Sequence, residues 1–326
     1  MSDQRGDFAF RGDSNFGTGG DSSFAGALSF LRRRYSRDLE GVDVVVSGIP
    51  FDAATTNRPG ARFGPRAIRA ASTEVACLDW FPHAIPIFDH LNVVDYGDCY
   101  FESGYPERIV DVVEAHADTI LRSGAKMLTF GGDHFVTYPL LKAHAKIHGP
   151  LALLHFDAHS DTWEDDGRKL DHGSMFLRAA RDGIIDPERS VQVGIRTSND
   201  STHGFTILTA PFVHREGIPA TLEHIRRVIG ASKTYVTFDI DCLDPAFAPG
   251  TGTPVPGGLD TSQALDLLRG LAGMELVGFD VVEVAPAYDN AEITAIAGAT
   301  IAQEMLGLLA LAKGATPVDL GPGFFT

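Results

Sequence analysis

From residue 42 onward, short apolar or β-branched runs alternate with amphipathic stretches, and this alternation constrains the fold more than any other feature of the chain. Several runs lack an apolar–polar alternation, which is typical of strands buried on both faces. Strand–helix repetition at this spacing favours right-handed crossovers and a parallel sheet covered by helices on both sides. The sequence therefore predicts an α/β fold, a three-layer α/β/α sandwich with a central, mostly parallel sheet of about eight strands.

The predicted elements can be given by residue range. The candidate strands are Asp43–Ile49, Asn92–Asp95, Lys126–Phe130, Leu151–Phe156, Val191–Ile195, Thr206–Leu208, Tyr235–Phe238 and Leu276–Val282. The candidate helices are Pro106–Ser123, Phe135–His148, Ala220–Ile229, Thr261–Leu271 and Ala291–Ala312. The stretch from Asn57 to Pro65 is rich in Pro and Gly, and we expect a rigid loop there.

The first 27 residues differ in composition from the rest of the chain. Up to about Ser23 the sequence is rich in Gly, Asp and Ser with isolated Phe8, Phe10 and Phe16, and such a segment cannot bury a core of its own. No interdomain linker or internal repeat is visible after it. We expect residues 1–27 to form a flexible N-terminal arm and residues 28–326 to form a single domain.

The charge balance and the cysteines exclude several classes of function. The chain has 27 Lys and Arg against 43 Asp and Glu, a formal charge of −16, which argues against nucleic acid and anionic membrane surfaces as partners. The three cysteines are scattered, without the spacing of a disulfide framework or a structural zinc site. We find no signal peptide and no apolar run that approaches the length of a membrane span, so we expect a soluble cytoplasmic protein.

Acidic and imidazole side chains follow three of the predicted strands. Asp157, His159 and Asp161 have i, i+2, i+4 spacing, and an extended chain places such side chains on one side. A second strand ends in Asp239 and Asp241, and a third runs through two glycines into an Asp–His pair at 133–134. Buried carboxylates without a partner are costly, and open parallel sheets gather ligands where their strands end. The pattern predicts a metal site at this edge of the sheet.

The composition of this cluster indicates which metal it holds. The proposed ligands are His134, Asp157, His159, Asp161, Asp239 and Asp241. Four carboxylates balance two divalent cations, and oxygen and imidazole ligands without thiolate favour Mn²⁺. Two such ions lower the pKa of a shared water, so that hydroxide forms near neutral pH. Cys242 has the opposite strand parity and is expected to face away, whereas His155 is expected to support the ligands rather than join them.

At these residues the sequence resembles the ureohydrolase family of arginases and agmatinases. Within it, the stretches at 131–137, 171–173 and 283–289 are particularly similar to bacterial agmatinases. The resemblance runs from about residue 42 to the C-terminus. The stretches that carry it are Phe130–His134, Phe156–Asp161, Phe238–Pro254, Gly48–Asp52, Arg58–Pro65 and Asp280–Pro286.

The resemblance implies an arginase-like fold, a catalytic domain over 28–326, two Mn²⁺ ions and hydrolysis of a guanidino group to urea and an amine. It makes the six residues above the metal ligands, and Asp161 would bridge or hydrogen-bond the attacking hydroxide. Glu283 would pair with the guanidinium, and His172 would carry a proton to the leaving amine. The resemblance also implies a homo-oligomer, a trimer or a hexamer.

The identity of the substrate depends on its tail. Trp163 and the acids at 164–166 follow Asp161 and suit a small cationic substrate, through cation–π and Coulomb attraction. Asn199 and Asp200 form a second candidate recognition loop. We therefore expect agmatine, cleaved to putrescine and urea. The alternatives are a guanidino acid such as 4-guanidinobutyrate, a catalytically silent regulatory homologue, and a deacetylase-like enzyme with one zinc ion.

Overall fold

A parallel sheet forms the middle of the molecule. The computed structural model describes residues 23–76, 78–166, 169–319 and 321, and within them nine strands pair in the order β1-β3-β2-β4-β9-β8-β5-β6-β7. All eight neighbouring pairs are parallel. The strands are β1 (Arg34–Tyr35), β2 (Val44–Ile49), β3 (Val93–Asp98), β4 (Lys126–Gly131), β5 (Ala152–Phe156), β6 (Val191–Ile195), β7 (Thr206–Thr209), β8 (Thr234–Asp239) and β9 (Leu276–Val282). The predicted sheet is confirmed, with the short edge strand β1 added.

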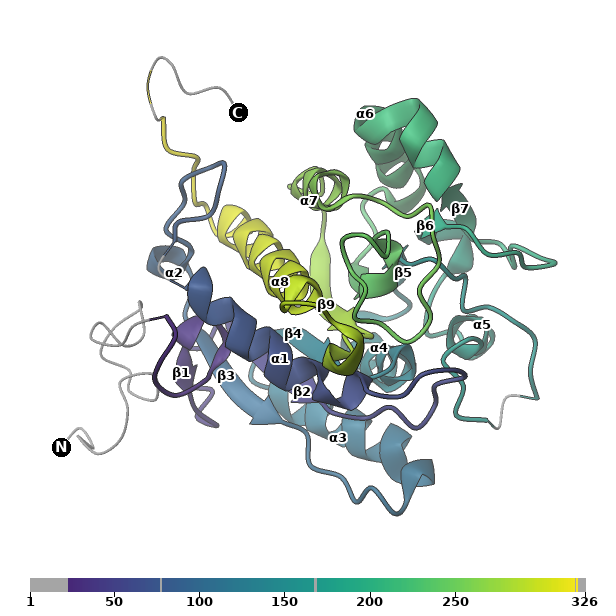
Figure 1. Cartoon of the computed structure of the whole chain (residues 1–326), viewed down its shortest axis with the longest axis horizontal. Helices are drawn as coiled ribbons and strands as arrows, with labels where there is room; N and C mark the ends of the chain where they lie inside the picture. The colour runs from purple at the N-terminus through teal and green to yellow at the C-terminus, as the bar shows by residue number, and fades with distance from the viewer. Residues whose placement is uncertain (1–22, 77, 167–168, 320, 322–326) are drawn as a thin grey trace.

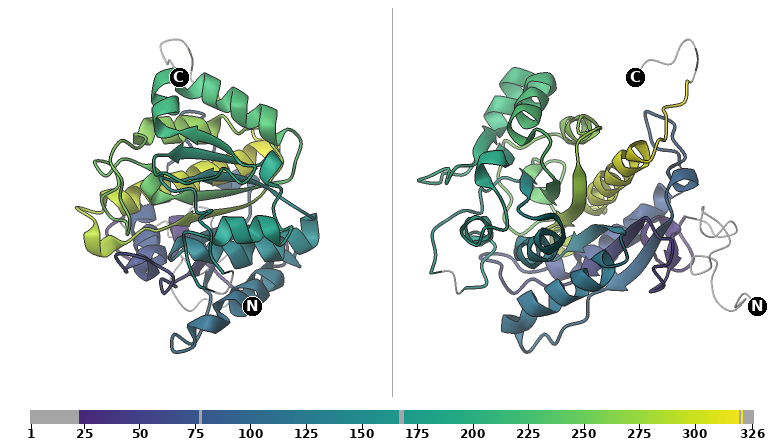
Figure 2. Two further views of the ribbon diagram at one scale, coloured as in Figure 1. Left: turned by 90° about the vertical axis from the view of Figure 1, so that its right-hand side faces the viewer. Right: turned by 180° about the vertical axis from the view of Figure 1, so that it is seen from behind.

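Helices cover both faces of this sheet (Figure 1). One layer contains α3, α4 and α5, which lie in front of the sheet in the right-hand view of Figure 2, and the other layer contains α1, α8, α7 and α6. The helices are α1 (Gly64–Ala71), α2 (Ile87–His90), α3 (Ile109–Leu121), α4 (Thr137–His148), α5 (Met175–Arg181), α6 (Ala210–Ile229), α7 (Thr261–Arg269) and α8 (Ile293–Ala312). The three-layer sandwich predicted from the sequence is therefore present.

The central strands are apolar on both faces because each face has its own core. All six residues of β2 are buried. Val44 and Val46 belong to the cluster beneath α1 and α8, whereas Val45 and Ile49 belong to the cluster beneath α3 and α4. Successive side chains of a strand point to opposite faces, so a continuous apolar run serves both layers.

Four helices differ from the prediction, and one of them is the short α2, which has no predicted counterpart. The expected loop over 57–65 gives way at Gly64 to α1, whose second residue is Pro65. A side chain at Gly64 would lie 2.5 Å from the carbonyl oxygen of Val284, so glycine allows this helix to begin against the end of β9. Helix α5 was not predicted. Helix α6 starts ten residues before the predicted Ala220, because Gly217, with a φ of 79°, joins two helical pieces.

Helix α8 corrects the expectation about apolar length. By length and composition it is able to cross a membrane, so the expectation that no apolar run approaches that length was wrong. Within the fold, 72% of its most apolar window is buried. It packs against α1, α7 and β9, which explains its composition as that of a core helix. Most of the predicted N-terminal arm, including Phe8, Phe10 and Phe16, lies outside the described residues.

A buried ion pair joins α1 to the edge of the sheet. Arg69 on α1 donates two hydrogen bonds to Asp95 on β3, at 2.7 and 3.0 Å, and a third to Asp98 at 2.6 Å. Asp95 is completely buried, and it also accepts a hydrogen bond from the backbone of Phe30. Removal of the cation would leave a buried carboxylate without its counter-charge.

Arg69→Met is therefore expected to lower the free energy of unfolding by about 3–5 kcal/mol. Arg66→Met is the matched control, because Arg66 lies exposed on the same helix and should change stability by less than about 0.5 kcal/mol. Urea denaturation followed by circular dichroism measures both. Equal midpoints for the two variants would contradict the role given to this ion pair.

Candidate metal centre

The candidate ligands lie where three central strands end. Strands β4, β9, β8 and β5 are neighbours and parallel, so their carboxyl ends meet at one edge of the sheet. His134 follows β4, Asp157 to Asp161 follow β5, Asp239 ends β8 and Asp241 follows it. Loops far apart in the sequence are thereby brought to one place, where open parallel sheets commonly bind ligands.

The loop after β5 brings its three candidate ligands inward by turning. Asp157 Oδ1 accepts a hydrogen bond of 2.6 Å from the backbone of His159. Asp161 has a φ of 51°, in the left-handed region that non-glycine residues rarely adopt, and its backbone oxygen accepts from Phe176 at the start of α5. The structure therefore holds Asp161 in a strained conformation, as often occurs at functional sites.

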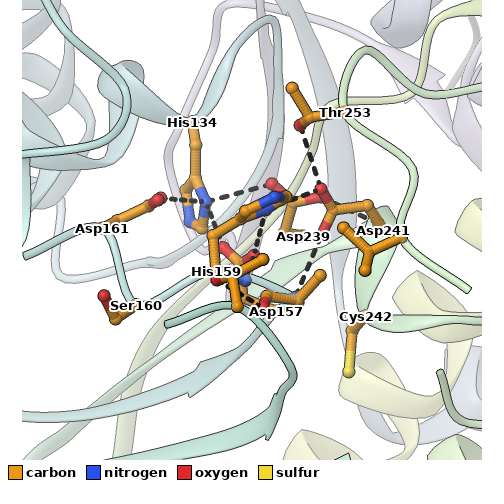
Figure 3. A network of polar contacts seen from close by, with 12 residues as sticks. His134, Asp157, His159, Ser160, Asp161, Asp239, Asp241, Cys242 and Thr253 are labelled. Atoms are coloured by element: carbon orange, nitrogen blue, oxygen red, sulfur yellow. Dashed lines mark hydrogen bonds and ion pairs between the residues drawn. The ribbon is translucent and has the colours of Figure 1, made fainter. Parts of the chain in front are cut away.

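The end of β8 is tied to the loop after β5. Asp239 Oδ1 accepts from the backbone of Asp241 at 2.8 Å and so caps the 3-10 turn η8 (Ile240–Cys242). Asp241 Oδ1 accepts from the backbone of Ala158 at 3.0 Å, and Thr253 donates to Asp241 Oδ2 at 3.1 Å. The Cys242 thiol points away from this cluster, toward the Val193 carbonyl (Figure 3).

His134 faces three carboxylates at once. Its Nδ1 lies 3.0 Å from Asp157 Oδ2, 3.1 Å from Asp239 Oδ2 and 3.2 Å from Asp161 Oδ2 (Figure 3). This nitrogen is fully buried, yet among the described residues it has no partner with hydrogen-bond geometry. A nitrogen and three oxygens that converge without hydrogen bonds are the arrangement expected around a cation.

A second group of ligand atoms adjoins the first. His159 Nδ1 lies 3.1 Å from Asp241 Oδ2 and 3.3 Å from Asp157 Oδ1. Asp157, His159 and Asp241 thus form one candidate site, and His134, Asp157 and Asp161 belong to another. Asp157 is common to both, so the cluster suits a pair of metal ions. All the donors are carboxylate oxygens and imidazole nitrogens, which fit hard or borderline divalent cations.

The electrostatics of the cluster also favour bound cations. Burial, followed by repulsion from Asp241 and Asp157, raises the pKa of Asp239 well above its usual value. Burial lowers the pKa of His159, but the nearby Asp241 and Asp157 raise that pKa to about 12. Without cations, this cluster therefore holds extra protons, and divalent ions would satisfy the same carboxylates.

His155, on β5, contacts the cluster through Asp157. Its Nε2 lies 2.7 Å from Asp157 Oδ2, and its Nδ1 lies 3.1 Å from the side-chain amide of Gln192. Burial alone would raise the pKa of Asp157, but the charge of His155 and the hydrogen bonds of the surrounding histidines hold it well below its usual value. His155 lies near enough to His134, Asp157 and Asp161 to count as a ligand by geometry. Its two contacts fit the supporting role expected from the sequence.

A buried hydroxyl network orients His134, and it was not among the features predicted from the sequence. His134 Nε2 lies 2.8 Å from Thr237 Oγ1, and Thr237 in turn donates to Asp280 at 2.5 Å. Asp280 also accepts from Thr137 and Tyr235. Because Thr237 uses its proton on Asp280, its oxygen accepts from His134 Nε2–H, which leaves the Nδ1 lone pair facing the carboxylates. A buried Asp inside an apolar strand was the available signal.

A cavity of about 290 Å³ opens above the cluster. No arginine or lysine among the described residues lines it, and its walls carry three carboxylates, two histidines, two threonines and one tryptophan. A separate cavity of about 260 Å³ between α7 and α8 is apolar and lacks titratable groups. The residues that line the first cavity are Thr56, His159, Asp161, Trp163, Asp171, His172, Gly173, Asp239 and Thr253.

His172 and Glu283 form a hydrogen-bonded pair beside the cavity. His172 Nδ1 lies 2.9 Å from Glu283 Oε1, and His172 Nε2 lies 3.0 Å from the backbone nitrogen of Thr56 and 2.8 Å from its hydroxyl. A neutral ring accepts from the Thr56 amide, whereas a charged ring donates to the Thr56 hydroxyl, so both protonation states have a partner. Burial lowers the pKa of His172, but Glu283 outweighs it and raises the pKa to about 9.

Glu283 is buried behind His172 and does not itself line the cavity. It is only 1% exposed and has a φ of 63°. Its Oε1 also accepts from the backbone of His134 at 2.9 Å. Its Oε2 is buried, and no other carboxylate oxygen of the described residues is buried without a partner. Such an atom is costly unless a ligand completes its hydrogen bonding.

Of the candidate residues for the substrate tail, Trp163, Asn199 and Asp200, the structure places only the first on the cavity wall. Trp163 lines the cavity. Asn199 instead donates to Ser160 Oγ at 2.9 Å and Thr162 Oγ1 at 3.0 Å, and so holds the loop that carries Asp161. Asp200 is exposed and does not line the cavity. Asp171 does line it, and the sequence reasoning did not give this residue a binding role.

Comparison with known proteins places the chain in a family. Residues 42–307 match the Arginase family. The chain is 59% identical to the agmatinase of Chromobacterium violaceum over 95% of its own length and 97% of that protein. The crystal structure of a hypothetical agmatinase from Burkholderia thailandensis superposes with a TM-score of 0.92 at 57% identity, covering 94% of this chain and 98% of that one. Proclavaminate amidino hydrolase from Streptomyces clavuligerus gives a TM-score of 0.84 at 41% identity, covering 90% and 100%. The chain therefore belongs to the arginase family.

Proposed function

We propose that the protein is an agmatinase, which hydrolyses the guanidino group of agmatine to putrescine and urea. One observation carries the proposal: a buried Asp–His cluster suited to two metal ions lies beneath a cavity whose described walls have acidic, aromatic, histidine and threonine side chains but no Arg or Lys. Such a cavity suits a substrate that is cationic at both ends. The similarity to agmatinases over nearly the whole chain supports the same activity.

We propose that the cluster binds two Mn²⁺ ions through His134, Asp157, His159, Asp161, Asp239 and Asp241. The four carboxylates match the charge of two divalent ions, and Asp157 reaches both groups of ligand atoms. Oxygen and imidazole donors without a thiolate suit Mn²⁺. When bound, the ions would supply Lewis-acid chemistry and a water of lowered pKa near the guanidinium carbon.

The protein's own groups orient the substrate and move the proton. We assign the guanidinium N–H groups to Glu283 Oε2, whose buried oxygen has no partner among the described residues. Asp161 lies on the cavity side of the cluster and would accept a hydrogen bond from the attacking water. His172, on the cavity wall, would donate its proton to the departing amine, which cannot leave as an anion.

The three other hypotheses make different demands on the site. A guanidino acid such as 4-guanidinobutyrate or arginine needs a basic or neutral polar partner for its carboxylate. The described walls carry no Arg or Lys. The histidines and threonines that line the cavity already have partners, His159 and Thr253 with Asp241, and His172 with Thr56 and Glu283. A silent regulatory homologue would have lost a ligand or His172, yet the structure brings these groups together. The deacetylase-like alternative needs one metal ion rather than a paired site.

A side-by-side urea assay of the Mn²⁺-loaded protein tests the proposed activity. The kcat/KM for agmatine is expected to exceed those for arginine and 4-guanidinobutyrate by at least about 100-fold, because each competitor brings a carboxylate into an acidic cavity. Metal-free protein in the same buffer is the control. Equal or faster urea release from 4-guanidinobutyrate would overturn the assignment of agmatine.

We further propose a homo-oligomeric assembly, a trimer or a hexamer, that works in the cytoplasm. In this proposal residues 1–27 form an arm ahead of a single catalytic domain over 28–326. These proposals rest on the resemblance to the family and on composition. Light scattering of the purified protein tests the assembly, and cell fractionation tests the compartment.

A further inference from the structure

We infer that Asp171 binds the distal ammonium group of the substrate and thereby selects a cationic tail. This inference rests on the proposed function, and it identifies the residue that determines specificity within the same cavity. Three features support it: the position of Asp171 on the cavity wall, the pairing of the other nearby charges, and the aromatic ring of Trp163 beside it.

Asp171 and Trp163 share one wall of the cavity. The Asp171 Oδ1 atom accepts a hydrogen bond of 2.7 Å from the backbone of Gly173, and the Trp163 backbone donates to the Gly173 carbonyl at 3.0 Å. A Cβ at Gly173 would lie 3.2 Å from Asp171 Oδ1 and 3.3 Å from Trp163 Cε3. The missing side chain therefore leaves the carboxylate and the indole close together on the wall.

Asp171 is the carboxylate that remains available in this wall. Its Oδ2 has no hydrogen-bond or ion-pair partner in the described part of the chain. Asp161 and Asp239, the other acids that line the cavity, belong to the candidate metal cluster. Of the acidic loop after Trp163, Glu164 is exposed and pairs with Arg181, and Asp165 accepts a hydrogen bond from Ser174. An ammonium group in the cavity would therefore find its free acceptor at Asp171.

Two described arginines of the surrounding loops, Arg58 and Arg196, already have other partners. Arg58 donates to the Thr251 and Gly252 carbonyls and stacks on Tyr288. Arg196 donates to backbone carbonyls that include those of Asp241 and Val255. A substrate carboxylate would thus meet the charge of Asp171 without a compensating cation from these side chains. The same residue attracts agmatine and repels guanidino acids.

The ring of Trp163 complements this carboxylate. An indole face attracts an ammonium group, and its apolar surface covers the methylene chain that precedes it. A charge-assisted hydrogen bond to Asp171 then fixes the end of the tail. Loss of such a bond typically weakens binding by about 10- to 100-fold.

Asp171→Asn tests the inference with the least change in structure, because the amide oxygen can still accept from the Gly173 backbone. The two substrates are agmatine and butylguanidine, which has the same chain without the ammonium. We expect kcat/KM for agmatine to fall about 10- to 100-fold, mainly through KM, and that for butylguanidine to change less than about threefold. Asp182→Asn is the matched control. Among the described residues the exposed Asp182 carboxylate accepts only from the Tyr138 hydroxyl, so its replacement should leave both values unchanged.

A binding measurement separates charge recognition from a structural role. Trp80 is buried and hydrogen-bonded to Glu304, so Trp163, the other tryptophan of the chain, should report a titration with putrescine by its fluorescence. We expect the Kd for putrescine to rise about 10- to 100-fold in Asp171→Asn. Equal loss of both substrates' kcat/KM would instead indicate a structural role for Asp171 and overturn the inference.

The outcomes also distinguish this inference from the proposed function. If the unmodified protein prefers agmatine and Asp171→Asn keeps that preference and the putrescine affinity, the inference fails while the proposed function stands. If the unmodified protein releases urea from 4-guanidinobutyrate as fast as from agmatine, the proposed function fails first. If the unmodified protein is selective for agmatine and Asp171→Asn loses that selectivity, the result supports both the proposed function and the inference.

Discussion

Asp241→Ala is expected to remove metal binding and urea release together. The Asp241 carboxylate lies 3.1 Å from His159 Nδ1, and no other group of the described residues replaces its charge in the second half of the cluster. Because loss of even an outer partner of a metal ligand costs roughly 10- to 100-fold in affinity or activity, we expect loss of a ligand to reduce kcat more than about 10³-fold.

Metal content and activity need to be measured on the same preparations. Isothermal titration calorimetry of Mn²⁺ into metal-free protein should show two bound ions per subunit for the unmodified protein and fewer for Asp241→Ala. Because Asp241 also accepts from the Ala158 backbone, Asp241→Asn is the second variant, as its amide oxygen preserves that bond. Asp118→Ala, at an exposed pair with Lys146, is the control. Retention of two tightly bound ions in both Asp241 variants would reject the ligand assignment.

His172→Ala is expected to lower kcat by about 10²–10⁴-fold while the protein retains its metal ions. The ring lies on the cavity wall, contacts Glu283 and Thr56, and has no contact that makes it a ligand of the cluster. Without it, the departing amine has no proton donor of suitable pKa. The variant loses proton delivery rather than metal binding, so kcat should fall while the measured metal content stays unchanged.

Rescue by added imidazole distinguishes this role from a structural one. Imidazole can enter the space left in His172→Ala and should restore part of kcat, with a pH dependence that follows its own titration. The unmodified protein should lose kcat as pH rises through the pKa of His172, which is raised to about 9 in the metal-free protein, because the proton donor is then lost. His90→Ala, on the exposed end of α2, is the control. An unchanged kcat in His172→Ala would refute the assignment.

Much of the site could be predicted because strand ends are easy to recognise in a sequence. Apolar runs that stop at Asp or His locate the edge of a parallel sheet, and they led to the loops after β5 and β8. The i, i+2, i+4 spacing correctly identified the loop after β5, but the extended backbone expected there was wrong. Asp161 was expected to follow an extended chain, but its φ of 51° shows that a turn brings it to the cluster.

The remaining features depend on tertiary contacts that have no local pattern. Nothing near Asp280 or Thr237 in the sequence indicates that they orient His134, because their partners come from β8, β9 and α4. The role of Asp171 appears only when Trp163 lies beside it. Asn199 was a reasonable candidate by residue type, yet its amide is already bonded to Ser160 and Thr162.

The order of strands in the sheet also determines when the metal centre can form. Strand β8 lies between β5 and β9, and β9 lies between β8 and β4, although β9 is the last strand of the chain. The ligands from β4, β5 and β8 therefore meet only after nearly the whole polypeptide has left the ribosome and its long-range pairings are complete. The candidate metal site is therefore complete only in the finished sheet, so the binding free energy of an ion held there would add to the stability of the folded state.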